Sequence, residues 1–436
     1  MITSVYRTIA LTALICFSAL SLGAPMDNAE LVKHYQHLHK NPELSLQEEK
    51  TAAYLARELA ALGYAVTTGI GGHGLVALLE NGKGPTIMYR ADMDGLPIAE
   101  NTGLPYSSIA TGQIPSGDEV PVMHGCGHDV HMTVLLGVAS EMAHRKDQWQ
   151  GTLMLLGQPA EEVGKGAKAM LSDGLFQRFP IPDYNIALHV SAALPAGKIA
   201  YVSGYAMANV DSVDILVRGQ GGHGAYPHKT KDPVVMAAQI VTTLQTIVSR
   251  EVSPLESAVI TVGSIHGGTK HNIISDEVKL QLTVRSYSDE TRAYLLRRIA
   301  EVSEGVARTA GMPSDQFPTI NIKDEYTPAV YNTPEFMEKL VPMLEASLGE
   351  DAVVESAPVM GGEDFARYGR TEEAIPGALL WLGVVNADTY AASTRGEINL
   401  PSLHSAKFAP DAAPSIEVGV NTMTDVLVRL LSDSDS

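Results

Sequence analysis

The 436-residue chain has few cysteines and a shortage of positive charge, and each shortage excludes a class of protein. Its only cysteines are Cys16 and Cys126, so the fold does not depend on a disulfide framework, and a chain of this length can bury a sufficient core without one. Lys and Arg number 31 against 50 Asp and Glu, which gives a net charge of −19 with neutral histidine. Because affinity for DNA or RNA depends on neutralising phosphates, this charge excludes a nucleic-acid-binding protein.

Long apolar segments are also missing, apart from one near the amino terminus. Residues 9–22 form an apolar run that follows Arg7 and leads to the small residues Gly23 and Ala24. The run is shorter than the ~20 residues of a membrane-spanning helix, and its flanks are typical of a signal peptide. We therefore expect residues 1–24 to be a signal peptide and the mature chain to be exported, periplasmic or secreted, without stable membrane insertion. A buried amino-terminal helix is the alternative.

Several motifs that define other enzyme classes are absent or misplaced. The glycine-rich stretch at residues 69–74 has the letters of a dinucleotide-binding loop, but it precedes a strand-like run instead of a helix, so we interpret it as a turn. The sequence contains no phosphate-binding Gly-Lys-Ser/Thr loop, no Gly-x-Ser-x-Gly nucleophile elbow and no His-Glu-x-x-His zinc motif.

Short apolar runs alternate with helix-length segments through most of the chain. The strand-like runs lie at residues 75–79, 86–89, 152–156, 185–190 and 378–385, and the helix-length segments at residues 27–40, 47–62, 132–145 and 165–171. This alternation predicts an α/β domain with a mostly parallel sheet.

The middle of the chain has a different pattern. Three runs there alternate apolar and polar residues like half-exposed strands and bracket two helical segments: the runs lie at residues 213–218, 258–265 and 279–287, the helices at 233–250 and 289–310. We therefore predict a smaller α+β domain at residues 206–328, inserted between two parts of the main α/β domain at residues 25–205 and 329–436.

Ionisable residues cluster where the predicted parallel strands end. They are Asp92, Asp94, Glu161, Glu162 and His189. Because the carboxyl ends of parallel strands meet at one edge of a sheet, we expect these side chains to converge on one crevice.

The loop at residues 124–131 is rich in side chains that bind metals. Its sequence, HGCGHDVH, holds one thiol, three imidazoles and one carboxylate, and its glycines allow the backbone to curl around an ion. Each feature also has a less specific interpretation. A lone cysteine is usually a small buried apolar side chain, adjacent glutamates are often a solvated turn, and the two aspartates could cap a helix. His404, far downstream, is uninformative by itself.

Five motifs follow one another along the chain. They are RADMDGLP at residues 90–97, HGCGHD at 124–129, QPAEE at 158–162, GHGAYPH at 222–228 and MGGEDF at 360–365. Together they resemble the N-acyl-amino-acid amidohydrolase family, which includes hippurate hydrolases and plant indole-acetyl-amino-acid hydrolases and is related to aminoacylases and glutamate carboxypeptidases. The resemblance covers nearly all of the mature chain. It implies a dinuclear-metal exopeptidase-like catalytic domain with an inserted lid domain that also forms a homodimer.

The resemblance also implies roles for individual residues. The implied metal ligands are Cys126, His128, Glu162, His189 and His404. The resemblance makes Glu161 the general base and Asp94 a carboxylate that orients a ligand. It makes His223 a lid residue that reaches the other subunit's site. Asn272 and Arg285 match residues that hold the substrate carboxylate. Less specific interpretations are an exposed turn for the lid histidine, a conformational role for the asparagine and a surface ion pair for the arginine. The chain departs from the family at Ser275, where proline is common, which affects turn stiffness and not chemistry.

These implied groups predict a reaction and a cofactor. Two divalent ions would lower the pKa of a shared water from about 15.7 toward roughly 7, and Glu161 would take its proton and pass it to the leaving amine. Thiolate and imidazole favour Zn2+ or Co2+, whereas carboxylate and water suit Mn2+. We expect a metal-dependent amidohydrolase that acts on N-acetyl, N-benzoyl or similar N-acyl amino acids.

Two other functions stay open from the sequence. A dipeptidase or carboxypeptidase could use the same scaffold, and an exported binding protein could hold metal without catalysis. Glu161 beside the ligand Glu162 argues against the binding protein, because that interpretation predicts the loss of a catalytic residue.

Overall fold

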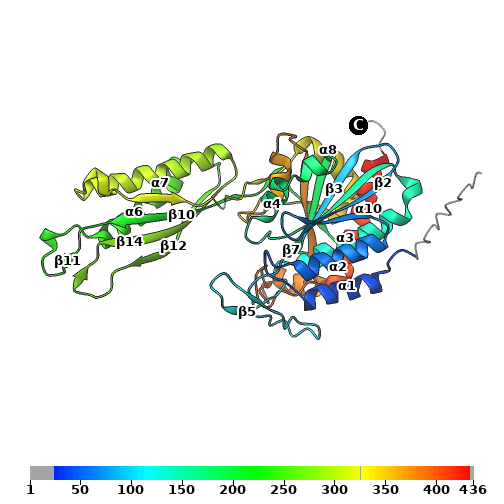
Figure 1. Ribbon diagram of the computed structural model, residues 1–436, viewed down its shortest axis with the longest axis horizontal. Helices are drawn as coiled ribbons and strands as arrows, with labels where there is room; N and C mark the ends of the chain where they lie inside the picture. The colour runs from blue at the N-terminus through cyan, green and yellow to red at the C-terminus, as the bar shows by residue number, and fades with distance from the viewer. Residues whose placement is uncertain (1–23, 325, 433–436) are drawn as a thin grey trace, which may run out of the picture.

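The computed structural model describes residues 24–324 and 326–432, which form two lobes (Figure 1). The predicted signal peptide, Cys16 included, lies outside the described residues except for Ala24. The larger lobe is built around an eight-stranded sheet and the smaller lobe around a four-stranded sheet. Within the two described ranges, no helix has both the length and the apolar character needed to cross a bilayer.

The large sheet has the strand order β1-β2-β6-β3-β7-β18-β8-β17. Its strands are β1 (Ala65–Ile70), β2 (Gly74–Asn81), β3 (Thr86–Asp92), β6 (Gly151–Gln158), β7 (Tyr184–Pro195), β8 (Ile199–Tyr201), β17 (Val353–Glu355) and β18 (Gly377–Val385). The central pairs β6–β3, β3–β7 and β7–β18 are parallel, whereas the β1–β2, β2–β6 and β18–β8 pairs are antiparallel. The predicted α/β class with a mostly parallel sheet is confirmed, with the antiparallel pairs toward the edges.

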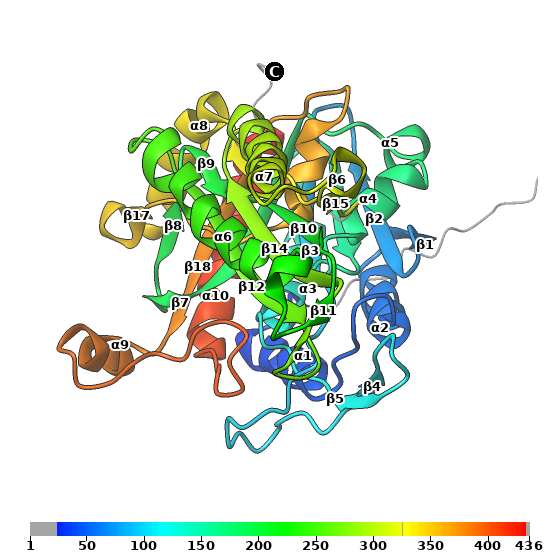
Figure 2. The same ribbon diagram turned by 90° about the vertical axis from the view of Figure 1, so that its left-hand side faces the viewer.

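Helices cover both faces of this sheet (Figure 2). Along β6, Leu153 and Leu155 enter one core while Met154 and Leu156 enter the other, because successive side chains of a strand point to opposite faces. The first core contains residues of α1 (Asn28–Lys40), α2 (Glu49–Ala61), α3 (His128–His144), α8 (Pro334–Leu348) and α10 (Ala412–Ser432). The second contains residues of α4 (Gly166–Ser172), α5 (Leu175–Arg178) and the 3-10 segment η6 (Asp364–Arg370).

Helix α3 begins at a position that only glycine suits. Gly127 precedes it with a φ of 81°, in the left-handed region, and an added Cβ would lie 2.5 Å from a methyl group of Val190 on β7. This close approach places His128, the first residue of α3, directly beside the end of the sheet.

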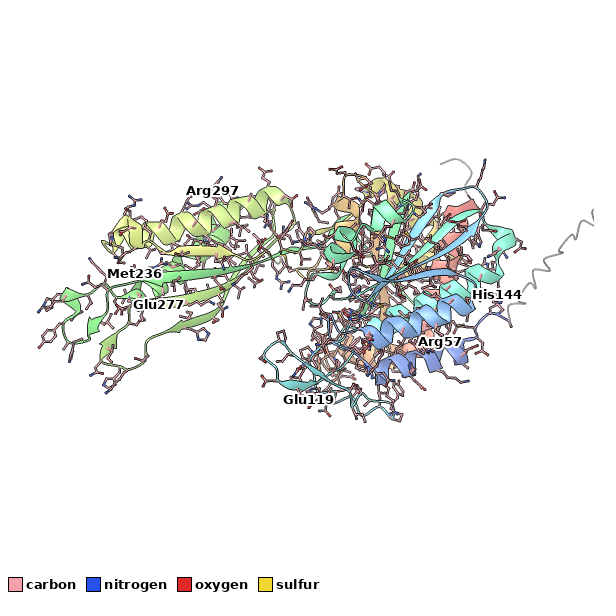
Figure 3. The ribbon with its side chains drawn as sticks, viewed as in Figure 1. Arg57, Glu119, His144, Met236, Glu277 and Arg297 are labelled. Atoms are coloured by element: carbon pink, nitrogen blue, oxygen red, sulfur yellow. The ribbon has the colours of Figure 1, made fainter. Side chains whose placement is uncertain are left out.

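The smaller lobe has its own core. Its strands and helices are β10 (Asn209–Arg218), β12 (Ala258–Gly267), β14 (Glu277–Ser286), β15 (Thr319–Ile322), α6 (Pro233–Thr246) and α7 (Asp289–Thr309). The antiparallel sheet has the order β12-β14-β10-β15, and alternate residues of β10 and β14 are buried. Met236 of α6 is buried in this core, whereas Arg297 of α7 lies on the outer side (Figure 3). This lobe is the predicted α+β insertion; its boundary residues stay a prediction.

Several small elements complete the two lobes. They are the hairpin of β4 (Thr111–Gln113) and β5 (Glu119–Pro121), the pair of β9 (Gly204–Met207) and β16 (Val330–Asn332), the pair of β11 (Gly222–His223) and β13 (Ile273–Ile274), and α9 (Ala387–Thr394). The N–H of Val210 donates to the carbonyl oxygen of Thr327 at 2.8 Å, so the two chain segments that join the lobes run side by side.

Candidate metal centre

The predicted crevice lies where β3 and β6 end, beside the middle of β7, which continues to Pro195. Segments that are far apart in the sequence bring five ligand-type side chains to it: Cys126 and His128 at the start of α3, Glu162 after β6, His189 on β7 and His404 in the loop before α10. These five are the ligands that the family resemblance implied.

The sulfur of Cys126 joins two groups of potential ligand atoms. It groups with His128 and His189 on one side and with Glu162 and His404 on the other, and the atoms of each group lie within 4.8 Å of one another. Sγ of Cys126 lies 3.6 Å from Nε2 of His189 and 3.3 Å from Nε2 of His404. Ligands at tetrahedral angles around a metal are roughly 3.3–3.8 Å apart, given bond lengths of about 2.0–2.3 Å. These separations therefore suit atoms that share an ion.

Backbone carbonyl groups determine which nitrogen of two histidines faces this centre. Nδ1 of His128 lies 2.8 Å from the carbonyl oxygen of Asp94, and Nδ1 of His189 lies 2.8 Å from the carbonyl oxygen of Val190. A carbonyl oxygen only accepts hydrogen bonds, so both Nδ1 atoms carry the proton. Each Nε2 then keeps a free lone pair, as a metal-binding imidazole requires.

His131 lies close to the centre, but both of its ring nitrogens are already engaged. Its Nε2 accepts the N–H of Val190 at 2.9 Å, so Nδ1 carries the proton and donates to Asp92 at 2.5 Å. Asp92 also accepts a hydrogen bond from Arg90 at 2.7 Å. These bonds leave His131 without a free lone pair for a metal, so its role is to hold Asp92 and the backbone of β7 in place beside the centre.

Two observations show that the residues present suit divalent cations. Nε2 of His128 and Oε1 of Glu162 are buried without a hydrogen-bond partner, which is costly unless an ion binds them. The surroundings also hold a large excess of acids, namely Asp92, Asp94, Glu161, Glu162, Glu363 and Asp364. Histidines apart, Arg90 is the only buried basic side chain in the described part of the chain. Two dications would offset most of this charge.

The same excess of negative charge opposes ionisation of the groups that would bind metal. Burial, with the nearby carboxylates of Glu162 and Glu161, raises the pKa of the Cys126 thiol well above its ordinary value. Burial and Asp94 raise the pKa of Glu162 to about 8. Burial, followed by the carboxylates of Glu363 and Glu162, raises the pKa of Glu161 well above its usual range. A thiolate at this position therefore needs a cation beside it.

Asp94 holds the loop that carries the two glutamates. One carboxylate oxygen accepts the N–H of Glu161 at 3.1 Å, and the other accepts the N–H of Glu162 at 3.0 Å and the hydroxyl of Ser45 at 2.6 Å. Burial opposes ionisation of Asp94, but hydrogen bonds from His128, Ser45 and the N–H of Glu162 outweigh it and hold its pKa below the usual range. Asp94 thus orients both the loop and, through its carbonyl group, His128.

A cleft of about 1240 Å³ opens above the centre, between the two lobes. Glu161, Glu162 and His404 line it from the larger lobe, and Arg285 lines it from β14 of the smaller lobe. Nη1 of Arg285 donates to the carbonyl oxygen of Met360 at 2.6 Å, so this arginine also bridges the lobes.

Two of the implied site residues do not reach this cleft within one chain. His223 on β11 and Asn272 beside β13 are exposed neighbours at the tip of the smaller lobe, the end away from the larger lobe (Figure 1). The N–H of Gly224 donates to the carbonyl oxygen of Asn272 at 2.9 Å, which holds the two residues together. The ten implied site residues therefore form two groups, eight at the candidate metal centre or the cleft above it and two at the tip.

Comparison with known families decides the relationship. The sequence profile of "Peptidase family M20/M25/M40" matches residues 88–406, almost the whole span from β3 to the loop before α10. The chain belongs to this family. It is therefore an enzyme, a metal-dependent hydrolase of the amidohydrolase and metallopeptidase type. The resemblance based on five motifs is confirmed at this level.

Individual relatives in the M20 family agree with this assignment. The chain is 39% identical to the amidohydrolase YhaA of Bacillus subtilis, over 78% of this chain and 82% of the relative. It is 35% identical to an N-acetyldiaminopimelate deacetylase of Leuconostoc mesenteroides, over 94% of this chain and 100% of the relative. A crystal structure of an aminohydrolase from methicillin-resistant Staphylococcus aureus matches with a TM-score of 0.81 and 31% identity, over 93% of this chain and 97% of the other. The YxeP protein of Bacillus subtilis, a dinuclear metal-binding M20 peptidase, matches with a TM-score of 0.74 and 27% identity, over 93% of this chain and 98% of the other.

Sequence reasoning missed residues that surround the candidate metal ligands of this M20 enzyme. Glu363 accepts a hydrogen bond from Arg90 at 2.8 Å; its motif was noted in the sequence, but no role followed from it. Ser45 and Glu48 contact the loop segment 158–162 or its anchor from the region before α2, and no pattern in the sequence pointed to them.

Proposed function

We propose that this M20 enzyme hydrolyses the amide bond of N-acyl amino acids with two divalent ions, Zn2+, Mn2+ or Co2+, and with Glu161 as the general base. The observation that carries the proposal is the pair of ligand groups that share the sulfur of Cys126, with Glu161 beside them. Relatives named N-acetyldiaminopimelate deacetylase support an acylated amino acid as the substrate.

The residues of the chain divide the chemistry between them. When bound to the five ligands, the ions supply Lewis-acid charge that acidifies a water and polarises the scissile carbonyl group. Glu161 belongs to neither of the two ligand groups that contain Cys126, but it lies close to them: its Oε2 is 3.9 Å from Nε2 of His128. Its carboxylate takes a proton from the water and gives it to the leaving amine. Burial, which raises its pKa, favours the protonated form that this second transfer requires.

The cleft offers complementary surfaces to the two ends of such a substrate. Arg285 keeps further N–H groups beyond the one bonded to Met360, and a guanidinium pairs well with a carboxylate. Ala192, Leu194 and Leu403 are among the apolar residues that line the cleft and would contact the acyl group. The proposed substrate therefore has a free carboxylate and an acyl group of low polarity.

We also propose that the enzyme is a homodimer in which the tip of one smaller lobe completes the cleft of the other subunit. Strand β12 is an edge of the small sheet, and Val234 and Val235 on the neighbouring α6 are 50% and 53% exposed. An open sheet edge beside exposed apolar side chains favours pairing with a second copy. His223 and Asn272 would then act in trans.

Subunit complementation tests the dimer. Glu161→Gln and His223→Ala variants are each expected to be inactive. Randomly mixed subunits are expected to regain about a quarter of wild-type activity, because half of the dimers then hold one intact site. Continued inactivity of a verified mixed dimer contradicts the contribution in trans.

A substrate panel tests the reaction. Values of kcat/KM are compared for N-acetyl, N-benzoyl and long-chain N-acyl amino acids, N-acetyldiaminopimelate and unacylated dipeptides. The proposal predicts the highest values among the acylated amino acids. Faster turnover of dipeptides would instead make the enzyme a dipeptidase on the same scaffold.

Export is a separate proposal that rests on residues 1–24 alone. Expression of the full chain in a bacterium, followed by cell fractionation and determination of the amino-terminal sequence, is expected to give a processed protein outside the cytoplasm. An unprocessed protein in the cytoplasmic fraction contradicts it.

A further inference from the structure

The loop that carries Glu161 contains a strained residue. Ala160, which is fully buried, has a φ of 52°, in the left-handed region of backbone conformation that residues other than glycine rarely adopt. Its carbonyl oxygen accepts hydrogen bonds from the N–H groups of Lys165 and Gly166, both at 3.1 Å. The chain therefore turns sharply immediately before the proposed general base, and such strain persists only where the surroundings hold it.

Two carboxylates hold three consecutive N–H groups of this loop. Asp94 binds those of Glu161 and Glu162, as described above. The third N–H, that of Ala160, donates to Oε1 of Glu48 at 2.7 Å. Glu48 lies far upstream in the sequence, so its contact with the loop is purely tertiary.

Glu48 occupies a position where its side chain would ordinarily serve its own helix. It is the N-cap residue of α2, yet its carboxylate makes no capping hydrogen bond to that helix. Its Oε1 instead accepts hydrogen bonds from the N–H of Ala160 and from the N–H of Leu46, the latter at 3.0 Å. Leu46 also has a left-handed backbone conformation, with a φ of 70°. The side chain of Glu48 is 0% exposed, and its other oxygen has no hydrogen-bond partner. A buried carboxylate that does not cap its helix needs another reason to be there.

We infer that Glu48 is a positioning residue for catalysis: it holds Ala160 in the left-handed conformation that directs Glu161 toward the cleft. This inference rests on the proposed role of Glu161 and adds a residue that does not touch substrate or ions. The important property of Glu48 is the length of its side chain, which places an acceptor oxygen at the N–H of Ala160, and not its charge. We call this length the reach of the side chain. Asp94 sets the position of the two glutamates, and Glu48 sets the turn that leads to them.

Two substitutions separate reach from charge. Glu48→Asp keeps the charge but withdraws the oxygen from Ala160, and aspartate is a favourable N-cap residue, so α2 stays folded. Glu48→Gln keeps the reach without the charge, because the amide oxygen still accepts both N–H groups. We expect kcat to fall at least tenfold in Glu48→Asp with KM within twofold, and to stay within threefold of wild type in Glu48→Gln. Both variants are expected to retain two ions per subunit by elemental analysis.

Glu43→Asp is the matched control. Glu43 lies in the same segment, and its carboxylate accepts hydrogen bonds from the N–H and hydroxyl groups of Thr51 in the first turn of α2, at 2.8 and 2.9 Å; neither bond involves the loop. Its kcat is expected to stay within twofold of wild type. A tenfold loss in this control would assign the effect to helix α2 in general and overturn the inference.

Other results also overturn it. They are a wild-type kcat in Glu48→Asp, a loss of metal in proportion to activity, or a fall in Glu48→Gln as large as that in Glu48→Asp. Glu161→Gln, measured in the same assay, separates this inference from the proposed function. If that variant turns over substrate normally, the proposed function fails; if it is inactive while Glu48→Asp is fully active, only the role of Glu48 fails.

Discussion

The sulfur of Cys126 lies 3.3 Å from Nε2 of His404, although 278 residues separate the two positions. One residue comes from the turn before α3 and the other from the loop before α10, so the contact joins the two parts of the larger lobe on either side of the inserted smaller lobe. Both proposed ligand groups depend on this sulfur, which makes it the most informative atom to change.

Replacing Cys126 with serine is expected to release at least one ion per subunit and to lower kcat/KM at least about 100-fold. A serine hydroxyl is smaller and stays protonated at neutral pH, so it cannot replace a thiolate. Elemental analysis of the purified variant, together with the activity assay, measures both effects. Retention of two ions contradicts the shared role of the sulfur.

Substitution of the adjacent residues Glu161 and Glu162 is expected to impair the enzyme in different ways. Glu161→Gln should keep both ions and lose about 10²- to 10⁴-fold in kcat, because a base is removed but no ligand. Glu162→Gln should lose metal, because an amide is a weaker ligand than a carboxylate. Metal content and kcat of the two variants, measured in parallel, act as controls for each other. Loss of metal in the first variant would reassign Glu161 as a ligand.

Removal of metal is expected to destabilise the folded protein. Without cations the centre keeps a buried thiol and an excess of acids around one arginine, and ions that bind only the folded state add about 2.7 kcal/mol when present at 100 times their dissociation constant. Chelated protein should therefore melt at a lower temperature in differential scanning fluorimetry, and Zn2+ or Mn2+ should restore the value. Equal melting temperatures with and without chelator would contradict a metal centre in the folded core.

His39 is expected to make stability depend on pH. Its Nδ1 lies 2.7 Å from Asp129 and its Nε2 lies 3.1 Å from Glu100. Burial alone would lower the pKa of His39, but the hydrogen bonds and charges of Asp129 and Glu100 outweigh it and raise the pKa from 6.5 to about 9. Because the folded-state value is the higher one, the stabilisation is complete below about pH 6.5 and is lost as the pH rises through about 9.

The comparison of wild type with His39→Gln isolates this effect from other titrations. At pH 6 the variant should be less stable by about 3 kcal/mol, the typical cost of removing one partner from a buried ion pair. The difference in melting temperature should shrink toward pH 10. A difference that grows with pH would mean that His39 is neutral in the folded protein.

The sequence was sufficient to predict those parts of the fold that follow from the local alternation of apolar and polar residues. It also predicted those parts of the site that lie directly after a predicted strand. The parallel strands β3, β6 and β7 brought Asp94, Glu161 and His189 together as expected, because β3 and β6 end at one edge of the sheet beside His189, although β7 itself continues to Pro195. Strands β8 and β17, at one side of the large sheet, were not predicted, since they have only three residues each and no clear alternation.

Other parts of the site depend on tertiary contacts that a single sequence does not encode locally. His404 stands in an irregular loop and received a role only through the family resemblance. Glu48 gave no signal, because its partner Ala160 lies in another part of the chain and the conformation of Ala160 is itself imposed by those contacts. The family resemblance implied that His223 reaches the other subunit's site and so anticipated its distance from the cleft of its own chain. The local sequence pattern did not, since this distance depends on how far the smaller lobe extends.

The placement of His404 after the inserted lobe also determines when the catalytic centre can form. During synthesis the first four proposed ligands emerge early, but the fifth follows only after the whole smaller lobe and most of the second part of the larger one. A nascent or prematurely terminated polypeptide thus contains an incomplete coordination sphere. The proposed centre therefore becomes complete only in the last stage of biogenesis, when the carboxyl-terminal segment docks.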